Sequence, residues 1–130
     1  MASLFSKIVS GEIPCHKVAE TNEFLAFLDI QPVAPGHTLV IPKKEIDDIF
    51  ELDDETLMGL HLFAKYVAQA IKKVVPSTKI GVSVIGLEVP HAHIHLIPIN
   101  GLGDMDFTKV RPTWDAEDLA DMAGKIAQNV

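Results

Sequence analysis

The segment that most constrains the fold of this chain lies at residues 91–97, where histidines alternate with apolar residues. A repeat of two residues is the side-chain period of a β-strand. As a strand, the segment places His91, His93 and His95 on one face and Ala92, Ile94 and Leu96 on the other. Imidazole nitrogens need hydrogen-bond partners or solvent, so the histidine face is poor material for a core. This face is therefore the first place to expect chemistry.

Other segments also have the composition and spacing of strands. Their ranges are residues 15–20, 24–29, 37–42 and 79–85. Apolar residues at spacings of three and four predict one long helix, which begins after Asp53 and ends at Pro76. Shorter helices are expected near both ends of the chain, one capped by Ser3 and one beginning at Asp115. Because the strands mostly follow one another, we expect a single α+β domain over residues 1–130, with an antiparallel meander of about five strands.

Composition narrows the classes of function. A chain of 130 residues with 48% hydrophobic residues can bury one core without disulfides. The formal net charge of −7 argues against a nucleic-acid partner, which requires clustered Lys and Arg. The single cysteine, Cys15, excludes an internal disulfide and fits a reducing compartment. No segment is long and apolar enough for a signal peptide or a membrane span, so we expect a cytoplasmic protein without a membrane partner.

Three interpretations of the histidine face follow from its chemistry. Two histidines on a strand can chelate zinc, but His91 and His95 would lie about 13 Å apart, so one ion cannot take all three rings. We therefore expect no metal and no cofactor. A neutral imidazole is also a good nucleophile toward phosphorus, and neighbouring rings can donate hydrogen bonds or carry charge. The third interpretation is a solvated, histidine-rich surface, and the order of residues alone leaves it open beside catalysis.

Three segments together resemble the histidine-triad (HIT) nucleotide-binding family. Residues 91–97 match every position of its pattern His-φ-His-φ-His-φ-φ, in which φ is apolar. Residues 24–43 resemble the upstream segment of the family, which runs from an aspartate to a histidine before an apolar strand. Residues 4–14 resemble its N-terminal opening. The resemblance covers roughly residues 4–99 and implies a HIT-like fold.

The resemblance also implies roles for the matching positions. His93 would be the nucleophile that forms a nucleotidyl-histidine intermediate, which water then hydrolyses. His95 would contact the α-phosphate, and His91 and His37 would complete the polar network. Asp29 falls where the family places a carboxylate on the ribose hydroxyls. Four residues fall where apolar side chains sandwich the base: Phe5, Ile8, Phe27 and Ile30.

Some positions depart from the family pattern. Glu88 and Val89 fall where the chain approaches the α-phosphate and the leaving group. The family usually has Gln where this chain has Leu87, and Ser or Thr where it has Glu88. Some relatives bind zinc through an N-terminal Cys-x-x-Cys, whose positions are Ser3 and Ser6 here, which argues against zinc.

The resemblance predicts a hydrolase that cleaves at the α-phosphate of purine nucleotide derivatives and releases a nucleoside monophosphate. His95 stands where the sugar-nucleotide transferase branch has glutamine, which favours hydrolysis. Adenosine phosphoramidates, the substrates of the purine nucleoside phosphoramidase branch, are the first choice, because a small amine leaving group suits a compact site. The alternatives are a diadenosine polyphosphate hydrolase and a nucleotide-binding regulatory module with little turnover. A homodimer is expected. Lys109 and Arg111 could contact phosphate, but solvated surface charges are the default interpretation for both.

Overall fold

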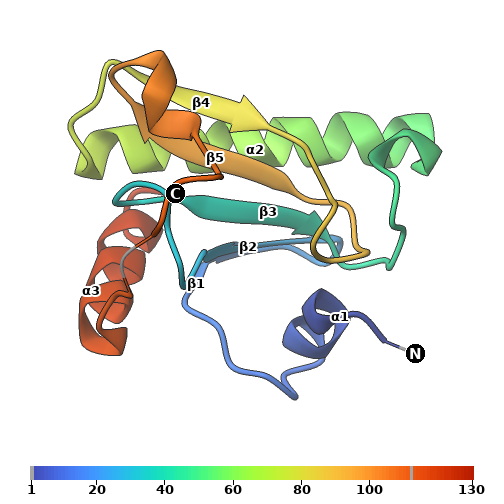
Figure 1. The fold of residues 1–130 in the computed structure, drawn as a ribbon. Helices are drawn as coiled ribbons and strands as arrows, with labels where there is room; N and C mark the ends of the chain where they lie inside the picture. The colour runs from blue at the N-terminus through green and yellow to red at the C-terminus, as the bar shows by residue number, and fades with distance from the viewer. Residues whose placement is uncertain (1, 112) are drawn as a thin grey trace.

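A computed structural model describes residues 2–111 and 113–130 of the chain. Five antiparallel strands form one sheet in the order β1-β2-β3-β5-β4 (Figure 1). The strands are β1 (Lys17–Glu20), β2 (Phe24–Leu28), β3 (Thr38–Pro42), β4 (Lys79–Ser83) and β5 (Ile94–Ile99). The helices are α1 (Leu4–Val9), α2 (Asp54–Val74) and α3 (Ala116–Ala127), with short 3-10 turns η1 (Ile49–Glu51) and η2 (Leu102–Met105). The α+β class and the antiparallel sheet are as expected.

The first three strands form the predicted meander. Thr21 closes the β1–β2 hairpin, because its N–H donates to the carbonyl of Phe24 at 2.9 Å while its hydroxyl accepts from the Phe24 N–H at 3.0 Å. After β3 the chain leaves the sheet, runs through α2 and returns at the far edge as β4. β5 then turns back and pairs with both β4 and β3. The strand order therefore departs from sequence order at one place, where β5 lies between β3 and β4.

Helix α2 forms where the apolar spacing predicts it and covers one face of the sheet. Leu52 and Leu57, on either side of the Asp53 N-cap, both pack into the core beneath the helix. Its buried face carries Leu60 and Ile71, both without exposed surface. Each such side chain contributes about 1.5–3 kcal/mol of burial free energy. Helix α3 packs on the same core through its own buried face.

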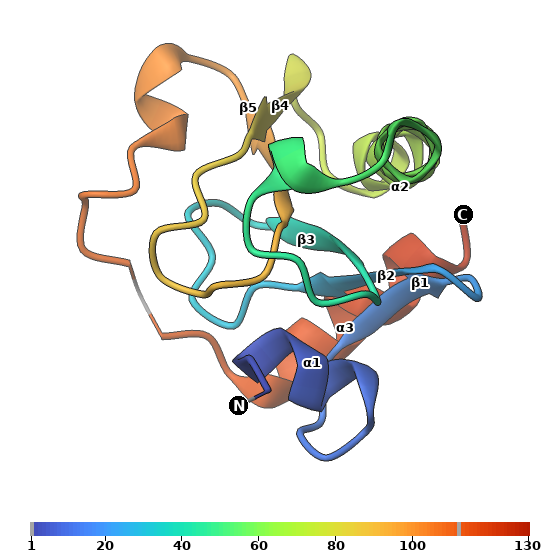
Figure 2. The same ribbon diagram turned by 90° about the vertical axis from the view of Figure 1, so that its right-hand side faces the viewer.

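The other face of the sheet carries a smaller apolar cluster under α1. This cluster contains Phe5, Leu25, Phe27, Leu39 and Ile41. In Figure 2, α2 and the loops that follow β4 and η2 lie on opposite sides of the sheet. Because both faces are covered, every residue of β2 and β3 is buried. Among the described residues, no helix combines the length and apolar character required to cross a bilayer.

The histidine segment enters the sheet later than expected. Strand β5 begins at Ile94, and the preceding residues are held by other bonds, including that from the Ala92 N–H to the Ile46 carbonyl at 2.7 Å. The predicted division of faces is nonetheless correct. Ala92, Ile94 and Leu96 pack in the core beneath α2, and the histidines face the side of α1. His91, His93 and His95 are 0%, 5% and 8% exposed, so the interpretation of a solvated histidine surface is wrong.

Candidate active site

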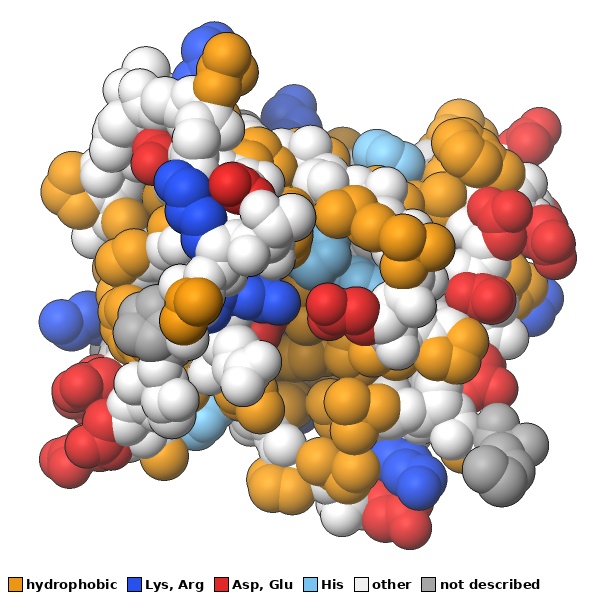
Figure 3. All heavy atoms as spheres, in the orientation of Figure 1, with side chains coloured by type: hydrophobic (Ala, Val, Ile, Leu, Met, Phe, Trp, Pro, Cys, Tyr) orange, Lys and Arg blue, Asp and Glu red, His pale blue; other side chains and the backbone are white. Residues whose placement is uncertain are grey.

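A cleft of about 400 Å³ opens on the α1 side of the sheet. Its volume is in the range of small-molecule sites. It brings together nine of the predicted site residues: Phe5, Ile8, Phe27, Asp29, Ile30, Glu88, Val89, His93 and His95. His37 and His91 do not line it and lie buried behind its wall. In Figure 3, histidine surface is visible at the bottom of a hollow bordered by hydrophobic, acidic and basic side chains.

Aromatic and aliphatic side chains form one end of the cleft. The ring of Phe5, on α1, meets that of Phe27, on β2, edge to face with centroids 5.5 Å apart. Phe5 also meets the His93 ring nearly at a right angle, with centroids 5.0 Å apart. Ile8 borders this pair and Ile30 is 64% exposed at the mouth. The result is an apolar slot beside His93, suited to a flat ring system.

The hydrogen bond of one nitrogen of His93 determines what the other nitrogen can do. Nδ1 lies 2.7 Å from the carbonyl oxygen of His91, and a carbonyl only accepts, so Nδ1 carries the proton. In a neutral ring Nε2 then keeps its lone pair, and no hydrogen bond within the described chain occupies it. Burial lowers the pKa of His93, which favours the neutral ring. The arrangement presents an unprotonated nitrogen at the cleft.

The same reasoning assigns the protons of His37 and His95. The Val33 N–H donates to Nδ1 of His37 at 3.0 Å, so the proton of the neutral ring is on Nε2. That Nε2–H donates to Nδ1 of His95 at 2.9 Å, which leaves the Nε2 of His95 protonated. Burial is the main cause that lowers the pKa of His37 to about 3 and that of His95 to about 4. His95 therefore lines the cleft as a neutral hydrogen-bond donor, in place of the charged ring considered from sequence.

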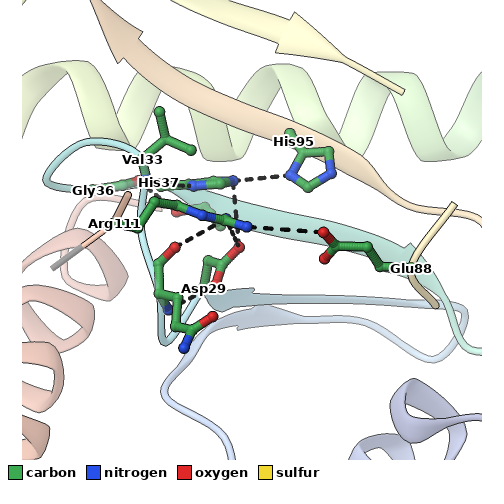
Figure 4. Close-up of polar contacts among 9 residues, drawn as sticks. Asp29, Val33, Gly36, His37, Glu88, His95 and Arg111 are labelled. Atoms are coloured by element: carbon green, nitrogen blue, oxygen red, sulfur yellow. Dashed lines mark hydrogen bonds and ion pairs between the residues drawn. The ribbon is translucent and has the colours of Figure 1, made fainter. Parts of the chain in front are cut away.

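A tight turn positions Asp29 beside the hydrogen-bonded pair of His37 and His95. The Asp29 N–H donates to the His37 carbonyl, and the loop between them bends at Gly36, whose φ of +88° favours glycine. A Cβ at Gly36 would also lie 2.9 Å from a methyl group of Val75. Oδ2 of Asp29 lies 3.7 Å from Nε2 of His37, as Figure 4 shows, and its Oδ1 accepts from the Gln31 N–H. Burial raises the pKa of Asp29.

His91 joins the site to α1. Its Nε2 donates to the Pro42 carbonyl at 2.7 Å, so its Nδ1 accepts the hydroxyl proton of Ser3 at 3.0 Å. The Ser3 hydroxyl in turn accepts from the Ser6 N–H and thereby caps α1. Glu45 accepts from the Ser3 N–H and the Ser6 hydroxyl, and these bonds lower its pKa to about 2. Ser3 and Ser6, the positions at which the resemblance implies zinc-binding cysteines in some relatives, thus belong to a hydrogen-bonded network with His91 and Glu45.

In both candidate sets of metal ligands, ligand atoms already make hydrogen bonds that a metal ion would have to replace. Hydroxyl oxygens of Ser3 and Ser6 replace the thiolates that structural zinc sites use, and the Ser3 hydroxyl already satisfies Nδ1 of His91. Asp29, His37 and His95 also bring ligand atoms together within 4.8 Å. An ion there would need the Nε2 lone pair of His37, which requires the proton to move to Nδ1 and the bond from Val33 to break.

Phe107 is among the lining residues that sequence reasoning missed, and Arg111 was set aside there in favour of a surface charge. The Phe107 ring lies 4.8 Å from that of His95, and Arg111 donates from Nη1 to the Gln31 carbonyl at 3.1 Å. The interpretation of Arg111 as a solvated surface charge is wrong, because its side chain is only 18% exposed. Both residues lie in an irregular segment after η2, where no periodic pattern signals burial.

Comparisons with known proteins agree with this architecture. The HIT domain model matches residues 10–101. The chain is 37% identical to Protein hit of Bacillus subtilis, over 98% of this chain and 93% of that protein. It is 42% identical to adenosine 5'-monophosphoramidase hnt1 of Schizosaccharomyces pombe, over 75% of this chain and 74% of that protein. The crystal structure of a Hit-like protein from Bartonella henselae matches with a TM-score of 0.86 and 33% identity, over 98% and 96% of the two chains. The chain belongs to the HIT family.

Proposed function

We propose that this protein is a nucleotide hydrolase that cleaves purine nucleotide derivatives of the adenosine phosphoramidate type at the α-phosphate. The observation that carries the proposal is the bond from Nδ1 of His93 to the His91 carbonyl, which leaves the Nε2 lone pair free at the cleft. The similarity to a protein named adenosine 5'-monophosphoramidase supports the choice of substrate.

The proposed reaction has two displacements at phosphorus. Nε2 of His93 attacks the α-phosphorus, and the P–N bond to the leaving amine breaks, with its electron pair passing to the amine, which takes a proton from water. Water then attacks the phosphorus of the nucleotidyl-histidine, the P–N bond to His93 breaks and its electron pair returns to Nε2. The attacking water gives up a proton, which neutralises the hydroxide left by the first step, and the nucleoside monophosphate is released. The Nε2–H of His95 donates to a non-bridging oxygen, where negative charge develops in both steps.

The nucleotide lies along the cleft in this proposal. The base enters the apolar slot of Phe5, Ile8, Phe27 and Ile30, and the ribose hydroxyls donate to the carboxylate of Asp29. Glu88 and Val89, in the loop before the histidines, face the leaving group. The chain needs no cofactor for this chemistry, since nucleophile and donor are its own side chains.

We further propose that two copies of the chain associate through the outer edge of the sheet. Within the described sheet β4 pairs only with β5, which leaves one edge of β4 open to another strand. Exposed apolar residues follow this edge and one stripe of α2: Val82, Val84, Ile85, Met58, Leu62 and Tyr66.

The free thiol of Cys15 is consistent with a reducing compartment, and we place the protein in the cytoplasm.

A nucleotide-binding module with little turnover is the alternative that a specific observation favours. Leu87 offers no donor, and the side chain of Glu88 is 86% exposed and negative where relatives carry donors. The same carboxylate would repel further phosphates, which disfavours a diadenosine polyphosphate as substrate.

The test compares the wild-type protein with the variant His93→Ala. We expect the wild type to release AMP from adenosine 5'-phosphoramidate, and the variant to lose turnover while it still binds AMP. Intact-protein mass spectrometry of enzyme quenched in denaturant during turnover should find one AMP per chain, and peptide mapping of the same sample should place it on the peptide that contains residue 93. Equal rates in the two proteins would refute the nucleophilic role, and AMP binding without turnover in the wild type would favour the binding module.

A further inference from the structure

The charge of the cleft does not match a phosphate. Its described lining residues include the carboxylates of Asp29 and Glu88 but a single side chain with a permanent positive charge, Arg111. His93 and His95 are buried, and burial favours their neutral forms, so the imidazoles supply hydrogen bonds but no fixed charge. A phosphate that enters a cleft with a mostly apolar lining needs a compensating charge. Within the described residues, only Arg111 can provide it inside the cleft.

The guanidinium of Arg111 is available for such a contact. It bridges the cleft between two carboxylates, with Nη1 3.9 Å from Oδ2 of Asp29 and Nη2 4.0 Å from Oε1 of Glu88 (Figure 4). Both distances exceed hydrogen-bonding range, and the bond from Nη1 to the Gln31 carbonyl uses one of five N–H donors. The planar group therefore retains donors for bidentate contact with a phosphate, for which arginine is well suited.

Packing fixes where this charge lies relative to the histidine donor. The Phe107 ring has its centroid 4.8 Å from that of His95, and the Arg111 guanidinium carbon lies 6.0 Å from the same ring. The Phe107 ring thus lies close to both groups, and the Gln31 carbonyl anchors the guanidinium. Donors from two different segments of the chain, His95 and Arg111, therefore line the same cleft.

We propose that Arg111 is a catalytic residue that binds the α-phosphate and stabilises the negative charge that develops on its oxygens. The inference deepens the proposed function and rests on it. In the free protein the exposed Glu88 carboxylate lies 4.0 Å from the guanidinium, and an incoming phosphate replaces it as the partner of Arg111. The released carboxylate then stands beside the leaving group, where it favours an amine over a further phosphate. Arg111 supplies the donors that are missing at Leu87 and Glu88.

The test separates binding of phosphate from binding of the nucleoside. Affinities of AMP and adenosine are measured by calorimetry for the wild type, Arg111→Gln, Arg111→Lys and the control Lys109→Gln. Lys109 belongs to the same segment, and its Nζ donates to the Gly103 carbonyl outside the cleft. We expect Arg111→Gln to weaken AMP binding about 10- to 100-fold and to leave adenosine binding unchanged. Lys109→Gln should change neither the AMP affinity nor the adenosine affinity. Arg111→Lys keeps the positive charge but loses the planar guanidinium, so its AMP affinity should lie between those of the wild type and Arg111→Gln.

A double-mutant cycle tests the role of Glu88. Glu88→Gln should tighten AMP binding, and this gain should be smaller in the Arg111→Gln background, where only the direct repulsion between Glu88 and phosphate is removed. Turnover of adenosine 5'-phosphoramidate should fall with Arg111→Gln. Unchanged AMP affinity in this variant, or an equal loss for adenosine, would overturn the inference. Absence of turnover in the wild type would instead contradict the proposed function, while the comparison of AMP with adenosine would still decide the role of Arg111.

Discussion

Replacement of Ser3 by alanine should destabilise the protein far more than its place near the end of the chain indicates. The Ser3 hydroxyl has two partners, because it donates to Nδ1 of His91 and accepts from the Ser6 N–H. Its removal leaves a nitrogen of a fully buried imidazole without a donor and removes the N-cap of α1. Both losses act on the junction between α1 and the histidine segment.

The expected magnitude follows from these two contacts. Loss of a serine N-cap costs about 0.5–2 kcal/mol, and a buried acceptor left without a partner costs about 1–3 kcal/mol. We therefore expect Ser3→Ala to lower the free energy of unfolding by about 1.5–5 kcal/mol, the sum of the two losses. Ser6→Ala is the matched control, because the Ser6 hydroxyl is 3.5 Å from the same nitrogen and bonds to Glu45 in an exposed position. Its loss should cost less than about 1 kcal/mol.

Urea unfolding of both variants measures the difference. The urea concentration at the midpoint of unfolding should fall for Ser3→Ala, while the dependence of the unfolding free energy on urea stays constant. This combination identifies a change of stability and not a change of the denatured state. AMP affinity should also fall in this variant, because α1 carries the Phe5 and Ile8 side chains of the apolar slot. Equal and small shifts in the two variants would refute the account of the Ser3–His91 bond.

Further predictions concern the hydrogen bond between His37 and His95, the apolar slot for the base, and the pH dependence of stability. His37→Ala should lower kcat about 5- to 30-fold with little change in KM. The reason is that Nδ1 of His95 loses its hydrogen-bond donor, which keeps the proton of the His95 ring on Nε2. An unchanged kcat would contradict this role of the hydrogen bond between His37 and His95. Ile30→Ala, at a 64% exposed position, should weaken AMP binding with little change in melting temperature, and unaltered affinity would place the base elsewhere. The free energy of unfolding, measured in urea, should fall as the pH drops from 6.5 toward 4. The pKa values of His37 and His95 in the folded chain, about 3 and about 4, lie below that of an unfolded histidine. In this pH range the unfolded chain therefore binds more protons on these rings than the folded chain does. The slope is up to about 1.4 kcal/mol per pH unit for each ring, and a midpoint that rises toward pH 4 would contradict it.

Local patterns predicted those features whose cause is local. The period of two at residues 91–97 placed the three histidines on the face opposite Ala92 and its apolar neighbours, as the structure has them. The N-caps at Ser3 and Asp115 also act as predicted, each accepting an N–H of the first turn. Capping and alternation depend on residues a few positions apart, so the sequence displays them directly.

Features that depend on distant residues were not predictable in this way. The position of β5 between β3 and β4 results from pairing across the α2 connection, and nothing local to β5 reveals it. Arg111 bonds to a carbonyl 80 positions away, from a segment without periodicity. The proton positions of the histidines depend on acceptors and donors such as Val33 N–H, whose contacts exist only in the folded chain.

The stereochemical course at phosphorus tests most directly whether Nε2 of His93 attacks the substrate. An adenosine phosphoramidate analogue made chiral at phosphorus with sulfur can be hydrolysed in ¹⁸O-labelled water and the configuration of the product determined. Attack by His93 followed by attack by water gives two inversions, so the account predicts net retention. Net inversion would mean that water attacks the substrate directly, and it would contradict a covalent role for His93.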